Sequence, residues 1–353
     1  MNSRERVRAT FERKPADRVP MWCGASPEFI EKSKQVLGVD SEEAVLVRFH
    51  DDFRRVTARY AGPDQFNPTL NAEKGVNINV FGIERDGYGY GQPTGHPLRE
   101  VSSLEEVEAY PWPNSDWMDA SHVREDTMRW NGEYAVMCGD WSPFFHDAID
   151  LLGMENMMIL MYEEPEIVHA VIGHIVDYYY AVTKKVIEAG GDALDILFIG
   201  NDLGCTTGPL MGVDLFNTFI APHIKRLCDL AHSHGLFTQM HVCGSFKQLM
   251  PSLIECGVDA LQSLQPNVRN MAPQELKRDF GDQFILNGCI DSVTVLIDGD
   301  VETVRKATIQ TLEMMKPGGG YILSPSHDYL LCDTPVENVL MMYDTGLEFG
   351  RYE

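Results

Sequence analysis

The sequence contains no long run of apolar residues. None of its apolar stretches reaches the ~20 residues that a helix needs to cross a bilayer, so we expect no membrane-spanning segment. The N-terminal stretch, MNSRERVRATFERKPADR, is charged and lacks the apolar core of a secretory signal. These two absences predict a cytoplasmic protein that does not associate with membranes.

Positive charge is also scarce. The chain has 29 Lys and Arg residues against 53 Asp and Glu residues, which gives a formal net charge of −24 at pH 7. A surface of this sign repels phosphate backbones, so we expect no nucleic-acid partner. Strong acidity is common among enzymes and identifies no partner by itself.

Cysteine and the familiar nucleotide motifs are sparse as well. Eight cysteines spread over 353 residues are too few for a disulfide framework. In a cytoplasm these thiols stay reduced, available as metal ligands or buried as small apolar groups. No G-x-G-x-x-G or G-x-x-x-x-G-K-[ST] opens a helix, and G-x-S-x-G is absent. The sequence therefore gives no sign of dinucleotide binding, a P-loop or an α/β-hydrolase nucleophile.

What the chain does contain is a regular alternation of strand and helix patterns. The expected strands, each followed by a helical pattern, lie at 134–139, 194–199, 236–240, 260–264, 284–287 and 321–324. Such alternation predicts a parallel sheet, either open or closed. Polar and sulfur-containing residues follow several successive strands. This favours a (β/α)8 TIM barrel, whose strand ends meet at one mouth, over an open sheet.

We expect one barrel domain, 1–353, in two parts. Residues 1–130 form an N-terminal helical extension, a short first strand near 19–23 and a lid, and residues 131–353 form the regular βα units. The segment 51–99 differs in character because it is rich in glycine and tyrosine. Its pattern predicts a hairpin, inserted as a lid rather than folded as an independent domain.

The stretch LFTQMHVCGS, 236–245, reads as a buried strand that ends in a metal-binding pair. His241 and Cys243 are two residues apart, so they project from the same face. An imidazole and a thiolate suit zinc, although an isolated pair of this kind is equally a core histidine beside a buried thiol. A further ligand must come from another strand end. Cys332 is the first candidate, His327 the second, and Cys289 is more simply a packed thiol.

Other candidate residues also follow strands. Asp202 and Asn201 end a very apolar strand, where a carboxylate either serves a site or caps the next turn. Trp141 follows an earlier strand and is either a site residue or a core aromatic. Tyr88 and Tyr90 either close over a flat substrate or pack against outer helices. The histidines within helical patterns are interpreted as structural: His146, His169, His174, His223, His232 and His234.

Four stretches together resemble the uroporphyrinogen decarboxylase-like superfamily: RVRATFERKPADRVPMW, GNDLGCTTGPLM, MHVCGS and GGGYILSPSHDYLLCDTPVENVLMMY. The resemblance covers nearly the whole chain and implies a (β/α)8 barrel with its active site at the carboxyl ends of the strands. True decarboxylases of this superfamily carry an arginine-rich R-Q-A-G-R segment after the first strand. Residues 22–27 read WCGASP here, with no arginine. The site pattern instead resembles the zinc-dependent methyltransferases that work with corrinoid proteins.

That class carries a His-x-Cys motif and a distant cysteine. The resemblance therefore implies that His241, Cys243 and Cys332 hold Zn²⁺. It implies a methyltransferase, the O-demethylase component, that moves a methyl group from a small methoxylated compound, aromatic ones included, to Co(I) of a corrinoid (cobalamin) on a partner protein. Zinc acts as a Lewis acid and the corrinoid carries the methyl chemistry. Homodimer formation is left open.

The remaining candidates then have roles beside the metal. Asp202 or His327 protonates or orients the leaving group, and the residues expected to line the substrate slot are Trp22, Tyr88, Tyr90, Trp141 and Asn201. The alternative is a metal-free, decarboxylase-like lyase in which Asp202 and His327 act as acid and base. A non-enzymatic barrel that binds a small ligand is a third reading.

Overall fold

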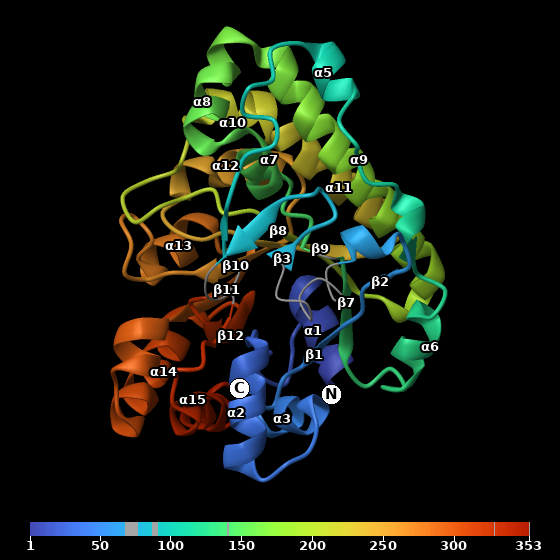
Figure 1. Ribbon diagram of the computed structural model, residues 1–353. Coiled ribbons are helices and arrows are strands. Elements are labelled where there is room, and N and C mark those ends of the chain that lie inside the picture. The colour runs from blue at the N-terminus through green and yellow to red at the C-terminus, as the bar shows by residue number, and fades with distance from the viewer. Residues whose placement is uncertain (68–76, 87–90, 140, 328, 353) are drawn as a thin grey trace.

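A parallel sheet of seven strands forms the centre of the molecule (Figure 1). The structure is a computed structural model and describes residues 1–67, 77–86, 91–139, 141–327 and 329–352. The strand order is β1-β7-β8-β9-β10-β11-β12, and every pair is parallel. The strands are β1 (Phe53–Arg55), β7 (Ala135–Cys138), β8 (Ile196–Gly200), β9 (Phe237–His241), β10 (Ala260–Leu264), β11 (Ile285–Ile290) and β12 (Tyr321–Pro325).

Residues 20–22 connect the two edges of this sheet. On one side, Leu323 N donates to Pro20 O at 2.9 Å and Trp22 N donates to Leu323 O at 3.1 Å. On the other side, Asp52 N, just before β1, donates to Met21 O at 2.9 Å. The segment thus lies between β12 and β1 and completes the ring of hydrogen bonds. The predicted α/β fold with a parallel sheet of the TIM-barrel type is confirmed.

Helices surround the sheet, as Figure 1 shows, and both termini lie close together beside it. Within the described ranges, no helix combines the length and the apolar character needed to cross a membrane. The helices are α1 (Ser3–Phe11), α2 (Pro27–Leu37), α3 (Glu42–Arg48), α5 (Leu104–Glu108), α6 (Val123–Met128), α7 (Phe144–Leu152), α8 (Met154–Glu163), α9 (Pro165–Gly190), α10 (Val213–Phe219), α11 (Ala221–Ser233), α12 (Met250–Glu255), α13 (Pro273–Phe280), α14 (Val301–Met315) and α15 (Val336–Phe349).

The strands are buried on both faces, which explains why they read as nearly continuous apolar runs. Their outer faces pack against the helices, and their inner faces fill the barrel. Helix α1 adds Val7 and Phe11 to the inner cluster, and the rings of Phe11 and Phe237 lie 5.0 Å apart. Helix α1 therefore packs at the amino ends of the strands, which leaves the carboxyl ends for the site.

The barrel includes a strand that sequence reasoning placed in the insertion. We expected 51–99 to be inserted as a unit, but its first part is β1. This prediction was wrong because the two arginines of β1 concealed the strand pattern. Phe53 belongs to the barrel interior, whereas Arg54 points outward and pairs with Glu43 at 2.7 Å. The guanidinium of Arg54 also lies 3.7 Å from the ring centre of Tyr134.

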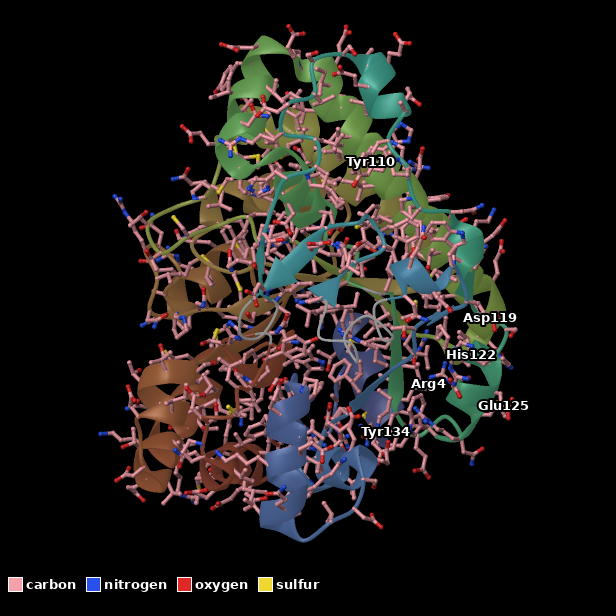
Figure 2. All side chains as sticks on the ribbon, viewed as in Figure 1. Arg4, Tyr110, Asp119, His122, Glu125 and Tyr134 are labelled. Carbon is pink, nitrogen blue, oxygen red and sulfur yellow. The ribbon has the colours of Figure 1, made fainter. Side chains whose placement is uncertain are left out.

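The rest of the insertion forms small antiparallel pairs. Strand β2 (Arg59–Tyr60) pairs with β6 (Met118–Asp119), and β3 (Asn77–Ile78), β4 (Glu84–Asp86) and β5 (Gln92–Pro93) form a three-stranded sheet. The pairing of β4 with β5 agrees with the predicted hairpin, while its action as a lid stays a prediction. Tyr88 and Tyr90 lie outside the described residues. Tyr110, labelled in Figure 2, donates to Phe81 O at 2.6 Å and ties this sheet to the helical layer.

Buried carboxylates hold α1 and the first strand segment in place. Arg4, labelled in Figure 2, and Arg8 donate to Asp195 at 3.0 and 2.8 Å. Asp52 is fully buried and accepts from Arg6 at 2.8 Å, from Arg18 at 2.8 Å and from the backbone N–H of Met21 at 2.8 Å. Asp52 thereby joins α1, residues 18–21 and β1.

The Asp52→Ala variant tests this junction. We expect it to lower the free energy of unfolding by about 3–5 kcal/mol, because removing one partner of a buried ion pair leaves the other charge uncompensated. Urea unfolding followed by circular dichroism measures the change. The Glu100→Ala variant is the control, since that side chain is 96% exposed and its removal should leave the curve unchanged. Equal midpoints for Asp52→Ala and the wild type would contradict this account of barrel closure.

Candidate metal centre

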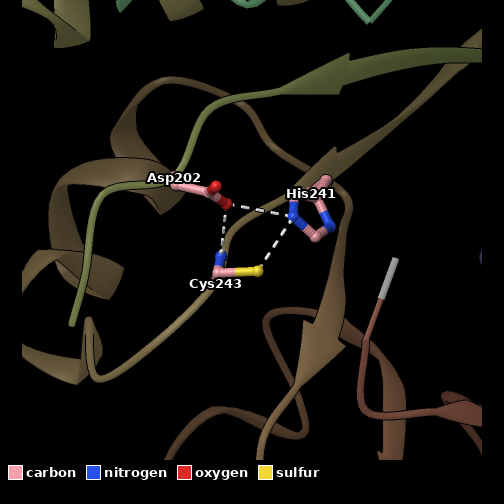
Figure 3. Close-up of side chains that lie close together, drawn as sticks. All are labelled: Asp202, His241 and Cys243. Atoms are coloured by element: carbon pink, nitrogen blue, oxygen red, sulfur yellow. Dashed lines mark hydrogen bonds and ion pairs between the residues drawn. The ribbon is translucent and has the colours of Figure 1, made fainter. Parts of the chain in front are cut away.

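Three potential metal ligands meet at the carboxyl ends of β8 and β9 (Figure 3). Asp202 follows β8, His241 ends β9, and Cys243 lies two residues later. The Nε2 atom of His241 is 3.1 Å from Asp202 Oδ1 and 3.1 Å from Cys243 Sγ. Their ligand atoms all lie within 4.8 Å of one another. The predicted side-by-side projection of His241 and Cys243 is confirmed, and Asp202 joins them.

The register between β8 and β9 explains why Asp202 lies beside His241 and Cys243. Gly200 pairs with His241 in the β8–β9 ladder, and the two chains leave their strands together. Beyond the strands, a Cβ on Gly244 would lie 2.4 Å from the carbonyl carbon of Gly204. Glycine at 244, with a φ of +80°, therefore allows the two loops to touch. This close approach keeps Asp202 beside Cys243, whose N–H donates to Asp202 Oδ1 at 3.2 Å.

A hydrogen bond fixes the orientation of His241. The ring is 1% exposed, and its Nδ1 lies 2.7 Å from Oε1 of Gln262 on the neighbouring strand β10. The amide oxygen accepts from Nδ1–H, so Nε2 is the nitrogen that faces Asp202 and Cys243. Without metal, Nε2–H donates to the carboxylate of Asp202. A metal ion would replace that proton and the proton of Cys243, and it would then meet nitrogen, oxygen and sulfur donors. The donor set fits a borderline-soft ion such as zinc.

The electrostatics of the group agree with a cation site. Burial favours the neutral form of Asp202, but hydrogen bonds from His146 and His241 outweigh it and hold the pKa of this carboxyl well below its usual range. Asp202 is thus ionised at pH 7. Burial raises the pKa of the Cys243 thiol, against the opposing effect of His241. In the absence of metal the sulfur therefore keeps its proton, and a metal ion bound there would displace it.

His146 belongs to this site, contrary to our structural interpretation of it. Its Nε2 lies 3.2 Å from Asp202 Oδ2, on the side of the carboxylate away from His241. His146 is in the first turn of α7, directly after the loop that follows β7, and this loop opens onto the mouth of the barrel. A histidine in the first turn after a barrel strand was the signal that could have identified it.

Trp141, predicted to bind substrate, contacts His241, one of the three potential metal ligands, and the neighbouring His146. Its ring stacks on His241 with centroids 5.2 Å apart and on His146 at 6.4 Å. A Cβ on Gly200 would lie 2.8 Å from the indole, so the absence of a side chain there makes room for Trp141. The indole covers one face of the His241 ring. Contact with a substrate stays a prediction.

Asn201 and Trp22 have different surroundings. Asn201 is fully buried, and its Oδ1 accepts from Phe145 N at 2.9 Å, so in this structure it positions the loop before α7. Trp22 is 4% exposed and stacks on Phe198 with centroids 6.4 Å apart. It lines a cavity of about 930 Å³ that also includes Tyr329. Substrate contact by Asn201 and Trp22 stays a prediction.

The candidates for a further ligand after β11 and β12 lie outside the three-residue group. Cys332 is exposed, and its backbone carbonyl accepts from Lys32. His327 Nδ1 accepts from Tyr329 N at 3.2 Å within its own turn. Cys289 is buried, and burial raises the pKa of its thiol to about 12, as expected of a packed cysteine. Ligation by Cys332 and a catalytic role for His327 stay predictions, because neither is among the described residues that gather around His241.

Comparison with known proteins assigns the family. The family described as uroporphyrinogen decarboxylase (URO-D) matches residues 123–349, well over half of the sequence. The chain belongs to the URO-D family. The resemblance expected from the sequence motifs is thereby confirmed.

The relatives of this URO-D family member are methyltransferases by name. It is 22% identical to the methylcobamide:CoM methyltransferase MtaA of Methanosarcina barkeri over 95% of this chain and 94% of that protein. It is 23% identical to the methylcobamide:CoM methyltransferase MtbA of Methanosarcina acetivorans over 92% and 94%. The solved structure of a methyltransferase from Methanosarcina mazei aligns with a TM-score of 0.72 and 19% identity over 99% of both chains, which supports the fold.

Gln262 offers a test of the metal centre that leaves the three candidate ligands intact. We expect Gln262→Leu to weaken zinc binding by about 10–100-fold, because outer partners orient a ligating histidine. Gln262→Glu keeps an acceptor for Nδ1–H and should retain the affinity. Competition with a chromophoric chelator measures zinc affinity, and circular dichroism confirms that both variants fold. If the Leu variant binds zinc as tightly as the wild type, His241 is not held by this hydrogen bond.

Proposed function

We propose that this protein is a corrinoid-dependent methyltransferase. Asp202, His241 and Cys243 would hold a metal ion, which would supply Lewis-acid chemistry to the heteroatom that gives or takes the methyl group. The observation that carries the proposal is the group itself. Three different donor atoms lie within 4.8 Å of one another at the catalytic end of the barrel. The named activities of the relatives support a corrinoid on a partner protein, because these relatives cover nearly the whole chain.

Each residue of the site has a separate role in the proposed reaction. A zinc ion bound there would supply a Lewis acid that polarises a bound oxygen or sulfur. Asp202, ionised through its hydrogen bonds, holds positive charge at the site rather than donating a proton. His146 contacts the other oxygen of Asp202 and is placed to hold or release a proton beside the reacting heteroatom. Trp141 covers His241 and limits the access of water.

A small methoxylated compound is our first candidate for the methyl donor. The methyl group would leave the methoxy oxygen and bind Co(I) of the corrinoid, while the oxygen takes up a proton. Aromatic donors are favoured because Trp22 and Tyr329 line the neighbouring cavity. The names of the relatives favour the opposite direction, in which the methyl group leaves the corrinoid for a thiol that loses its proton. Both directions require the same heteroatom site.

Three further expectations belong to this proposal. A location in the cytoplasm, a partner protein that carries the corrinoid, and a homodimer all stay predictions. The alternative, a metal-free lyase, is less well supported. Residues 22–27 lack arginine for a polyanionic porphyrinogen, and the formal charge of −24 opposes such a substrate.

Metal content is the first experimental test. We expect about one zinc per chain in the purified protein, as in other sites built from nitrogen, oxygen and sulfur donors. The His241→Ala and Cys243→Ser variants should lose it, because each removes a donor from the group. The control is His234→Ala, at an exposed position in the turn after α11. Mass spectrometry of the bound metal measures the content, and loss of zinc in Cys332→Ser would add Cys332 to the ligands.

Methyl transfer is then measured with free cobalamin. Methoxyarenes are offered to cob(I)alamin, and small thiols are offered to methylcobalamin, with the change of corrinoid absorbance as the readout. Transfer that is lost in His241→Ala and kept in His234→Ala supports the proposal. A well-folded wild type that holds no metal and transfers no methyl group in either direction would overturn it and favour the lyase.

A further inference from the structure

Two adjacent arginines of β1 have opposite surroundings. Arg54 faces outward, and all its groups have partners. Its Nε and Nη2 donate to Glu43 at 2.9 and 2.7 Å, and its Nη1 donates to the carbonyls of Asp51 and Phe53. Arg54 therefore stabilises the wall of the barrel and has no free donor to offer.

Arg55 points to the other side. It shares a face of the strand with Phe53, which belongs to the barrel interior. Its guanidinium carbon lies 4.4 Å from the ring centre of Phe198 on β8. Among the described residues, Arg55 has no hydrogen bond and no ion pair. Guanidinium groups in partly buried surroundings normally have hydrogen-bond partners, and none of the five donors of Arg55 has an acceptor among the residues that the structure describes.

The surroundings of Arg55 suit a small ligand. Arg55 lines the cavity of about 930 Å³ together with Trp22, Met137 and Tyr329. This volume is typical of small-molecule sites. Apolar side chains line it beside Arg55, and its lining also includes Arg54, which is paired with Glu43, as well as Glu42, Arg129 and Glu133. Asp51 also lines the cavity, but burial raises its pKa to about 8, so its carboxyl is neutral at pH 7 and provides no counter-charge.

The strand order relates Arg55 to the metal centre. Arg55 ends β1 and His241 ends β9, with β7 and β8 between them. The ladders place Arg55 level with Met137, Ile196 and Phe237, so the two backbones are roughly 14 Å apart across the strands and roughly 13 Å apart along them. The long side chain of Arg55 spans part of this offset, since its guanidinium lies over Phe198. Phe198, beneath Arg55, and Gly200, paired with His241, are two residues apart on β8 and therefore face the same side. One small molecule can reach both positions.

We propose that Arg55 binds a carboxylate of the substrate, whose methyl-bearing or methyl-accepting heteroatom lies at Asp202, His241 and Cys243. This inference rests on the proposed function and specifies its substrate class as small carboxylic acids that carry a methoxy or thiol group. A guanidinium and a carboxylate match in plane and form two parallel hydrogen bonds. Phe198 supports the guanidinium from below, and Trp22 bounds the apolar part of the molecule.

Matched substrate pairs test the proposal. The donors are 4-methoxybenzoate and 4-methoxybenzyl alcohol, and the acceptors are 3-mercaptopropionate and 3-mercapto-1-propanol. The wild type should have the lower KM for the carboxylate of each pair. In Arg55→Met this KM should rise by about tenfold to a hundredfold, since a charged hydrogen-bonding pair is lost. The kcat and the KM of the alcohols should change little, and Arg55→Lys should recover part of the preference.

The control variant is Arg59→Gln, an arginine on β2 whose side chain is 63% exposed. It should behave as the wild type with all four compounds. Circular dichroism establishes that the Arg55 variants fold. Equal KM values for acid and alcohol in the wild type, unchanged in Arg55→Met, would overturn the carboxylate site while leaving methyl transfer intact.

Direct binding separates this inference from the proposed function. Calorimetric titration of 4-methoxybenzoate, without corrinoid, should give a Kd that rises at least about tenfold in Arg55→Met. If the wild type binds the acid through Arg55 but transfers no methyl group, the proposed function fails and the carboxylate site stands. If Arg55→Met binds 4-methoxybenzoate as tightly as the wild type, the carboxylate site fails.

Discussion

The hydrogen bond between Gln262 and His241 is the contact on which the site depends. It directs Nε2 of His241 toward a carboxylate and a sulfur instead of leaving the ring free to rotate in a buried pocket. The nitrogen, the carboxylate oxygen and the sulfur thereby lie at about hydrogen-bond distance from one another. Strand register, a glycine contact between loops and a stacked indole hold this arrangement.

The two ends of the barrel have separate tasks. At the amino ends of the strands, α1 packs into the barrel, and buried Asp52 and Asp195 bind its arginines. At the carboxyl ends, Asp202 stays ionised beside two histidines, and the guanidinium of Arg55 lies over the ring of Phe198. The buried ion pairs at the amino ends of the strands stabilise the barrel. The carboxyl ends are then available for residues that bind a ligand.

Much of this arrangement could be predicted from sequence because it follows from local rules. The alternation of strands and helices predicted the barrel, and the two-residue period of a strand predicted that His241 and Cys243 project together. The position of Asp202 beside His241 was not predicted, because residues from different strands are brought together by register and loop contacts that no local pattern records. Asp202 was expected to be catalytic, and the role of Cys332 as a ligand stays a prediction.

Two further predictions from the sequence were wrong: the assignment of β1 to the insertion and the structural interpretation of His146. The arginines of β1 resembled an insertion, although one pairs with Glu43 outside the barrel and the other lies over Phe198 of the barrel interior. His146 was interpreted as an ordinary helical residue. Its contact with Asp202 arises because the loop after β7 is short and places the first turn of α7 beside the end of β8, which the helical pattern alone does not reveal. In both cases the local pattern was interpreted correctly in part, but the tertiary contact that gives the residue its surroundings could not be predicted from it.

X-ray absorption at the zinc edge of the purified protein tests whether His241 and Cys243 bind the metal together. We expect a first shell that contains sulfur at about 2.3 Å together with nitrogen or oxygen at about 2.0–2.2 Å, with the sulfur lost in Cys243→Ser. A shell of nitrogen and oxygen alone in the wild type, or one unchanged by that substitution, would contradict it.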